Sequence, residues 1–255
     1  MPTPSDFDRL CIVLVSTRNP LNIGAAARAM SNLGFLRLRV VNPYEASFRE
    51  ARSAVGAAPL LAKAEQYSSV GEAVADCSLV VGTTAGASRE LHHPLRLLQE
   101  AAPLIRKRLQ AGARVALLFG SEKRGLSNDD FSHCHWLMHI PTREEHTSMN
   151  LGQAVAVCLY ELTRGPSAAN RGMSKSSRQA EKAKSATAGE LERITAVLID
   201  ALRASGYLGE RAVAAKEEKV RRMVRRLELS SADAEVWLGM LRQMLWKMKP
   251  PGNGQ

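Results

Sequence analysis

The sequence predicts an α/β fold in which a parallel sheet carries helices on both faces and a small helical module follows. Apolar, β-branched runs alternate with helical segments over the first 164 residues. Polar loops containing glycine follow several of these runs. Beyond residue 190, apolar side chains recur only at helical spacing. We therefore expect a sheet domain at 1–164, a linker at 165–189 and a helical module at 190–249.

Apolar runs that form the predicted strands lie at 9–16, 36–42, 79–84, 115–119 and 136–140. Most of them are apolar almost throughout, which is typical of strands that are buried on both faces of a parallel sheet. In the second run, charged and apolar residues alternate, with Arg37 and Arg39 set against Leu38 and Val40. The strands are therefore expected to lie in one parallel sheet.

Helices are predicted between and after the strands, at 22–33, 51–64, 70–75, 97–110 and 150–163. Gly34, Gly112 and the pair Gly165–Pro166 mark the ends of three of them. This order fits a simple doubly wound sheet as well as a knotted one. Because true knots are very rare in proteins, the pattern alone favours the simple sheet.

The segment 165–189 contains five basic residues, one acidic residue and almost no large apolar side chain. Such a composition predicts a flexible, basic linker. After it, three groups of apolar residues repeat at helical spacing and predict a module of about three helices. The groups are Leu191, Ile194, Leu198 and Leu202; Val220, Val224 and Leu227; and Val236, Met240 and Met244.

Composition bounds the function. The chain of 255 residues has a net charge of +10 and a pI near 9.8, which favours a polyanionic partner such as nucleic acid. No apolar run approaches the roughly 18 residues of a membrane span. The N-terminal residues lack the pattern of a signal peptide, so the expected location is the cytoplasm, without a membrane partner.

Cysteine and histidine spacing argues against a metal site. Cys11, Cys77, Cys134 and Cys158 are scattered, as expected of small buried hydrophobic residues and not of a disulfide framework. The run His133-Cys134-His135 has no second ligand pair at zinc spacing, and neighbouring strand side chains point to opposite faces. We expect no metal cofactor.

Three polar loops follow predicted strands, at 22–28, 119–127 and 148–151. Open α/β sheets bind ligands at the carboxyl ends of their strands, so these loops lie where a ligand would sit. Glycine lets the backbone approach a ligand closely because it has no Cβ. No Gly-x-Gly-x-x-Gly motif follows the first strand, which makes a nicotinamide-dependent dehydrogenase a poor alternative.

In this order the three loops resemble the motifs of the SPOUT class of RNA ribose 2′-O-methyltransferases. The matched stretches are 22–28, 117–127 and 140–160, and the resemblance is strongest to the TrmH-type enzymes of the TrmJ-like subfamily. The resemblance implies an α/β trefoil knot, S-adenosyl-L-methionine as the cofactor, a homodimer, and tRNA as the substrate. It further implies methylation at position 32 of the anticodon loop.

The resemblance also implies the residues of the cofactor site. The strand end at 83–84, the loop at 120–125 and the segment around 140–151 would form the pocket. The cofactor-binding residues implied in this way are Thr83, Thr84, Gly120, Glu122, Gly125, Ile140, Ser148, Met149 and Leu151.

The catalytic residues implied by the resemblance are Arg28, Asn22, Ser148, Asn150 and Glu122. A guanidinium keeps its proton at neutral pH and is a poor base. We therefore expect Arg28 to grip a phosphate and to stabilise the developing alkoxide, while a phosphate or water accepts the proton. Ser148 would bond the substrate hydroxyl or cap the following helix. Glu122 would order its own loop through Lys123 or Arg124, or orient Arg28.

RNA is expected to contact Arg18, Arg28, Lys123 and Arg124, together with arginines of the linker and tail. Two related functions remain as alternatives: a ribosomal RNA 2′-O-methyltransferase of the same fold, and a knotted RNA-binding protein without activity. The motif residues argue against the second alternative, because a protein that had lost catalysis would have no need of them. A DNA-reading helix-turn-helix in the C-terminal module is disfavoured by the mixed charges of its helices.

Overall fold

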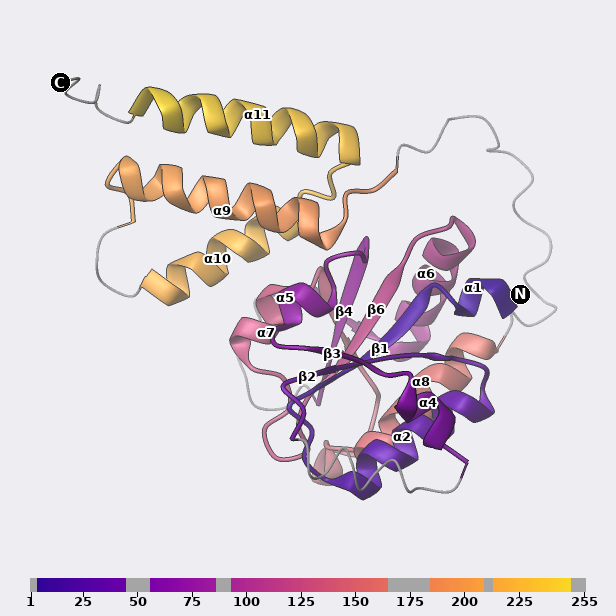
Figure 1. Cartoon of the computed structure of the whole chain (residues 1–255). Coiled ribbons are helices and arrows are strands. Elements are labelled where there is room, and N and C mark those ends of the chain that lie inside the picture. Colours follow the sequence, from indigo (N-terminus) through magenta and orange to yellow (C-terminus); the bar gives the residue numbers. More distant parts are fainter. Residues whose placement is uncertain (1–3, 45–55, 86–92, 165–183, 209–212, 249–255) are drawn as a thin grey trace.

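The computed structural model describes residues 4–44, 56–85, 93–164, 184–208 and 213–248 (Figure 1). Within these residues the chain forms a seven-stranded sheet of order β3-β2-β1-β6-β4-β7-β5, and every strand pairing is parallel. The predicted fold class is therefore confirmed. The strands are β1 (Leu10–Val15), β2 (Arg37–Val41), β3 (Glu65–Tyr67), β4 (Leu79–Thr84), β5 (Leu95–Leu97), β6 (Val115–Phe119) and β7 (Trp136–His139).

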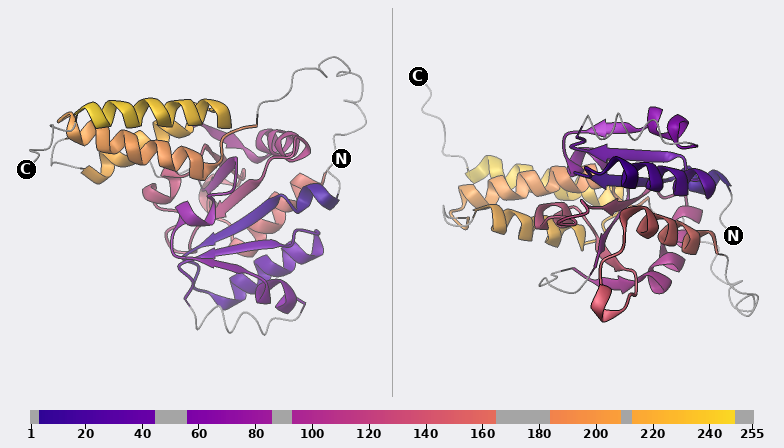
Figure 2. Two further views of the ribbon diagram at one scale, coloured as in Figure 1. Left: turned by 45° about the horizontal axis from the view of Figure 1, so that its top comes forward. Right: turned by 90° about the horizontal axis from the view of Figure 1, so that it is seen from below.

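Helices cover both faces of the sheet, as the views in Figure 2 show. Alternate residues of β1 point to opposite faces: Ile12 belongs to one apolar core and Val13 to the other. The first core is closed by α2 (Pro20–Asn32), α4 (Ala58–Ala62), α6 (Leu98–Gln110) and α8 (Leu151–Thr163). The second is closed by α5 (Val70–Ala73) and α7 (Asn128–Ser132).

Most of the short elements were not predicted. The edge strands β3 and β5 have three residues each, and the helices α1 (Pro4–Phe7), α5 and α7 have four or five. Periodicity needs a longer window, so it revealed only α5 among these. The helix predicted at 51–64 is present as α4 over its last part, and residues 45–55 lie outside the described residues. Helix α2 begins two residues earlier than predicted, because Asn19 caps it and Pro20 occupies its first turn.

In the described residues, the segment predicted as the C-terminal module holds three helices: α9 (Ala188–Ala204), α10 (Val213–Arg225) and α11 (Ser231–Met248). In Figure 1 they lie together beside the α5 and α7 end of the sheet domain. Thr187 and Glu190 form a capping box at the start of α9. Residues 165–183 of the predicted linker lie outside the described residues.

The module packs on the sheet domain through buried polar contacts. The backbone N–H of Ala188 donates to the carbonyl of Cys77 at 2.7 Å, and Ala188 itself joins the second core. The buried guanidinium of Arg225 donates to the Ala188 carbonyl at 3.0 Å and to Glu192 at 3.1 Å. Arg221 donates to Ser132 Oγ of α7 at 3.0 Å. Some of the module's charges therefore stabilise its position on the sheet domain.

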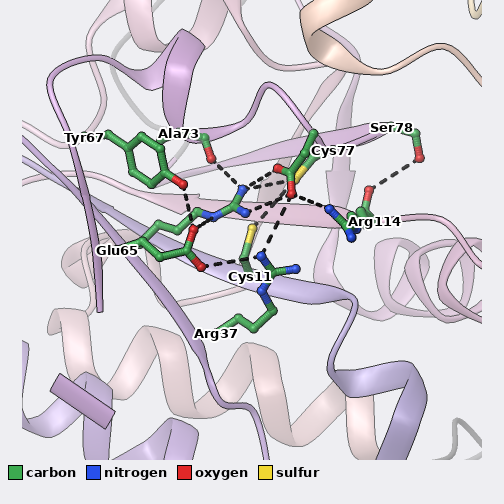
Figure 3. A network of polar contacts seen from close by, with 10 residues as sticks. Cys11, Arg37, Glu65, Tyr67, Ala73, Cys77, Ser78 and Arg114 are labelled. Carbon is green, nitrogen blue, oxygen red and sulfur yellow. Dashed lines mark hydrogen bonds and ion pairs between the residues drawn. The ribbon is translucent and has the colours of Figure 1, made fainter. Parts of the chain in front are cut away.

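A buried arginine ties β2 to the loop before β4 (Figure 3). Arg39, whose side chain is 3% exposed, donates to both carboxylate oxygens of Asp76, at 2.6 and 2.9 Å. This bidentate pair holds the pKa of Asp76 well below its usual range. The Sγ atoms of Cys11 and Cys77 lie 3.7 Å apart beside it. All four cysteines are buried free thiols, which confirms their predicted structural role.

His133 and His135 are held in their neutral form. Burial lowers the pKa of His133 to about 4 and that of His135 to about 3. The described part of the chain contains no group of three or more His, Cys, Asp or Glu side chains arranged to hold a metal ion. Among the described helices, none has the length and apolar character needed to cross a membrane.

Candidate functional site

A cavity of about 520 Å³ opens at the carboxyl ends of β4, β6 and β7. This is the edge at which parallel sheets bind ligands. Every residue that the sequence predicted for the cofactor lines the cavity: Thr83, Thr84, Gly120, Glu122, Gly125, Ile140, Ser148, Met149 and Leu151. The fold thus brings together segments that are separated by up to 68 positions in the sequence, from 83 to 151.

The loop after β6 is a tight turn that needs glycine at two positions. Gly125 has a φ of +66°, and its N–H donates to the carbonyl of Ser121 at 2.8 Å. A Cβ on Gly120 would lie 2.1 Å from the carbonyl carbon of Gly125. This distance is far below a van der Waals contact, and the backbone of Gly125 cannot move away without opening the turn. The turn therefore excludes any side chain at Gly120. The turn ends at Ser127, which caps α7.

Hydrogen bonds between side chains join the three predicted loops. Glu122 Oε1 accepts from Asn22 Nδ2 at 3.1 Å, and Asn22 Oδ1 accepts from Asn150 Nδ2 at 2.8 Å. Asn150 Oδ1 then accepts from the N–H of Gly152 at 3.0 Å and caps α8. These hydrogen bonds form one continuous network that runs from the loop after β6, through Asn22 of α2, to the start of α8.

Glu122 contacts the first turn of α2 beyond its bond to Asn22. Its carboxylate accepts from the backbone N–H of Asn19 at 3.3 Å and, at the limit of a hydrogen bond, from that of Arg18 at 3.5 Å. Lys123, Arg124 and Arg28 are the partners predicted for Glu122, and the structure places its carboxylate at the N-terminus of α2. A carboxylate is favoured there because the helix dipole and its free N–H groups point toward it.

For Ser148 the sequence left two roles open, a bond to the substrate hydroxyl and the capping of α8, and the observed cap of α8 bears on the second. Asn150 is the N-cap residue, so Ser148 does not cap this helix. Ser148 and Asn150 both line the cavity. The hydroxyl of Ser148 therefore remains available to a ligand, and its bond to the substrate hydroxyl stays a prediction.

Close packing of α2 against α8 fixes the helix starts that carry Asn22 and Asn150. A Cβ on Gly152 would lie 2.6 Å from the Cβ of Ala25, so the two helices approach each other as closely as glycine permits. Any larger residue at Gly152 would separate the helices and lengthen the bond between the two asparagines.

The basic residues predicted for RNA occupy three places. Lys123 and Arg124 line the cavity. The guanidinium of Arg18 lies over the ring of Tyr44, 5.9 Å from its centroid. Arg28 is exposed on α2 and does not line the cavity. It follows Asn22 by six residues, so its side chain points in a direction about 120° away around the helix. Its catalytic role stays a prediction in which the side chain meets the substrate from outside the cofactor cavity.

Several cavity residues were missed by the sequence reasoning. These residues are Ala85, Phe119, Ser121, Leu126, Phe131, Thr142, Thr147 and Ala154. All but Ala85 and Phe131 lie inside the motif stretches 117–127 and 140–160, so assigning the whole of each stretch to the cavity would have found them. Ala85 directly follows the predicted Thr84, and Phe131 lies on α7, a five-residue helix with no periodic signal of its own.

Comparisons with known proteins agree with this geometry. The model of the SpoU rRNA Methylase family matches residues 9–160. The chain is 34% identical over 242 residues to the tRNA (cytidine/uridine/adenosine-2′-O-)-methyltransferase TrmJ of Pseudomonas aeruginosa, covering 93% of this chain and 94% of that protein. It is also 34% identical over 246 residues to TrmJ of Sodalis glossinidius, covering 94% and 92%.

A solved structure is similar over nearly the whole chain. The crystal structure of TrmJ from Z. mobilis ZM4 has a TM-score of 0.77 and 29% identity, covering 92% of this chain and 98% of that one. The similarity thus includes the C-terminal helices as well as the sheet domain. Together with the cavity at the carboxyl edge, these matches show that the chain belongs to the SpoU methylase family, among the TrmJ-type RNA 2′-O-methyltransferases.

Proposed function

We propose that this protein is an S-adenosylmethionine-dependent tRNA ribose 2′-O-methyltransferase that modifies nucleotide 32 of the anticodon loop. The observation that supports this proposal most is that residues of all three motif loops line one cavity. The relatives of the chain are named as tRNA 2′-O-methyltransferases. A tRNA substrate would place the enzyme in the cytoplasm.

The cavity suits the cofactor. Its volume of about 520 Å³ lies within the roughly 300–1,000 Å³ that is usual for sites of small molecules. Phe119, Leu126 and Ile140 supply an apolar wall for an adenine ring, and the turn at Gly120 exposes backbone groups to hydrogen-bond it. The bound cofactor supplies a methyl group on a cationic sulfonium.

The hydrogen-bond network of Glu122, Asn22 and Asn150 would hold the substrate ribose beside that methyl group. Ser148 and Asn150 offer a hydroxyl and an amide at the N-terminus of α8. These groups would orient the 2′-hydroxyl of the substrate ribose. Arg28 would grip the neighbouring phosphate and stabilise the developing alkoxide, while a phosphate or water takes the proton. Lys123 and Arg124 would contact the RNA backbone at the rim.

A homodimer is part of the proposal. Helices α2 and α8 pack side by side and expose apolar side chains: Leu21 is 79% exposed, and Tyr160 is 58% exposed, one turn beyond the partly exposed Val157. Arg28 follows Leu21 by seven residues, two turns along the same stripe of α2. A second copy covering this stripe would bring its own surface next to Arg28.

Methylation of purified tRNA tests the activity. We expect the full-length protein to transfer a labelled methyl group to tRNA, and mapping of modified riboses to find it at nucleotide 32. Methylation of ribosomal RNA in place of tRNA would contradict the substrate, and modification at another tRNA nucleotide would contradict the position.

Arg28→Ala tests the catalytic assignment. Because Arg28 lies outside the cofactor cavity, the variant should bind S-adenosylmethionine with wild-type affinity in calorimetry while its methyl transfer falls by at least about 100-fold, the order lost with one electrostatic stabiliser. Arg28→Lys should also be impaired, since lysine lacks the bidentate fork. Near-normal turnover of Arg28→Ala would show that the residue is not catalytic.

A further inference from the structure

A second cavity, of about 1,010 Å³, lies at the opposite edge of the sheet from the cofactor cavity. Its walls are the amino ends of β4, β6 and β7, the C-terminal end of α6 and the segment that leads into α9. We call it the amino-edge groove. Five basic residues and two acidic residues line it: Arg96, Lys107, Arg108, Arg114, Lys184, Asp76 and Glu228.

Most of the positive charge in the amino-edge groove is not neutralised. Asp76 is bound by Arg39, accepts from Arg114 at 2.8 Å and forms an ion pair with Arg37 at 3.9 Å (Figure 3), so one acid already serves three arginines. In the part of the chain that the structure describes, none of the other four cations forms an ion pair with a carboxylate. These four are Arg96, Lys107, Arg108 and Lys184.

Arg96 and Arg108 are held in place by neighbouring residues, and each keeps N–H donors that can bind an anion. The guanidinium of Arg96 lies over the indole of Trp136, 5.6 Å from the ring centroid, which orders the group without using its N–H donors. Arg108 donates to Ser185 Oγ at 3.1 Å, and this bond joins the sheet domain to the segment before α9. Both arginines keep further N–H groups for an anion.

A helix dipole explains part of this arrangement, because Lys107 and Arg108 lie in the last turn of α6. It does not explain Arg96 on β5 or Lys184 before α9, which belong to other elements and converge on the same groove. The four cations come from three separate elements of the fold, and this convergence is what an anion-binding surface requires.

The exposure of these cations decides the class of ligand. Arg96, Lys107 and Lys184 are exposed, and the groove has no buried cradle that would enclose a single small anion. Spread, solvated cations along an open groove are typical of contacts to the phosphates of a nucleic acid backbone.

We infer that the amino-edge groove binds the phosphodiester backbone of the substrate tRNA away from the nucleotide that is methylated. This inference rests on the proposed function. The five residues of β6 separate the groove from the cofactor cavity by about 16 Å, at roughly 3.3 Å per residue. The groove therefore contacts RNA beyond the target loop and bridges the sheet domain and the C-terminal module.

The experiment compares two double variants of the full-length protein with equal loss of charge. Lys107→Ala/Lys184→Ala removes two groove cations, and Lys63→Ala/Lys219→Ala removes two exposed lysines outside the groove. A third variant, Lys107→Arg/Lys184→Arg, keeps the charge. The measurement is the affinity for full-length tRNA over a range of salt concentrations, together with kcat and KM for methylation.

The groove variant should bind tRNA more weakly, and its log–log salt dependence should become shallower by about 1.5, because about 0.7–0.9 counterions are released per phosphate contact. Its KM should rise while its kcat stays unchanged, and the arginine pair should restore both the affinity and the slope. Equal slopes in the groove and control pairs would overturn the inference, as would a failure of the arginine pair to restore binding. If the wild-type protein methylated no tRNA, the proposed function would fail, and that result is independent of the comparison of slopes.

Discussion

Glu122 lies far in sequence from α2 and α8, yet its side chain is hydrogen-bonded to the residues at the start of α2 and, through Asn22, to Asn150. Its carboxylate accepts from the first turn of α2 and from Asn22, which in turn bonds Asn150. The bond from Glu122 to Asn22 spans 100 positions in the sequence. Because Asn22 has no other carboxylate partner in the described residues, Glu122 fixes which way its amide faces. It is therefore a positioning residue for the two asparagines.

Glu122→Ala should slow methyl transfer by releasing Asn22 and Asn150 from their shared orientation. We expect kcat to fall by at least about 10-fold, since a misplaced group costs one to two orders of magnitude. Glu122→Gln should recover part of the rate, because its amide oxygen can still accept from Asn22. Glu144→Ala, which removes an exposed carboxylate from the neighbouring turn η1 (Glu144–His146), is the control. Equal kcat values in the two alanine variants would contradict the positioning role.

Helices α7, α9 and α10 meet at a cluster in which charge is balanced around a neutral histidine. His133 follows α7 and faces Arg221 and Arg225 of α10, Glu192 of α9 at 3.9 Å, and Asp129 of α7. Burial and the two arginines lower the pKa of His133 to about 4. Protonation would therefore add a buried positive charge beside two others, and it would weaken the docking of the module.

Acid should destabilise the protein through His133. The folded pKa is about 4 and the ordinary value is 6.5, so the unfolded chain binds more protons between these values. The stabilisation is complete above about pH 6.5 and is lost as the pH falls toward 4, by at most about 1.4 kcal/mol per pH unit. His135, whose pKa is also lowered, adds to the same trend.

Thermal unfolding across pH 4–7 measures this effect. His133→Asn cannot take up the proton, so its free energy of unfolding should depend less on pH than that of the wild type. His146→Asn, at an exposed position, should keep the wild-type dependence. Parallel pH profiles for the wild type and His133→Asn would show that His133 does not carry the acid sensitivity.

At the scale of the whole molecule, the described residues include two apolar surfaces that a second copy could cover. One is the α2 and α8 face with Leu21 and Tyr160; the other is α11, where Met240 and Met244 are exposed one turn apart. The first adjoins the candidate catalytic residues, whereas the second belongs to the module. Only the first would let a partner complete the RNA surface around Arg28, and for this reason we propose it as the dimer interface.

Tyr160→Glu should convert the proposed dimer to a monomer, because a carboxylate at the centre of an apolar interface would lose its water without a partner. Met244→Glu should leave the dimer intact. Light scattering on the two full-length variants measures the mass directly. A monomer produced by Met244→Glu and not by Tyr160→Glu would instead assign dimerisation to the C-terminal module.

Local sequence was enough to predict the elements and the motif loops. The five longer strands and the main helices followed from apolar runs and from glycine and asparagine at strand ends, because these signals act over a few residues. The nine residues predicted for the cofactor, all of which line the cavity, followed from the family resemblance. The knot followed only from family resemblance, since periodicity carries no information on how a chain is threaded.

Tertiary structure alone decided which distant residues meet. The bond between Glu122 and Asn22, the buried pair of Arg225 and Glu192, and the convergence of Arg96 with Lys184 each join segments that are 33 to 100 positions apart. Glu122 and Asn22 belong to the motif loops, but no local pattern shows that they bond to each other, that Arg225 is buried against Glu192, or that Arg96 and Lys184 share a groove. These contacts depend on the order of the strands and on the place where the C-terminal module docks, and both are set by long-range packing.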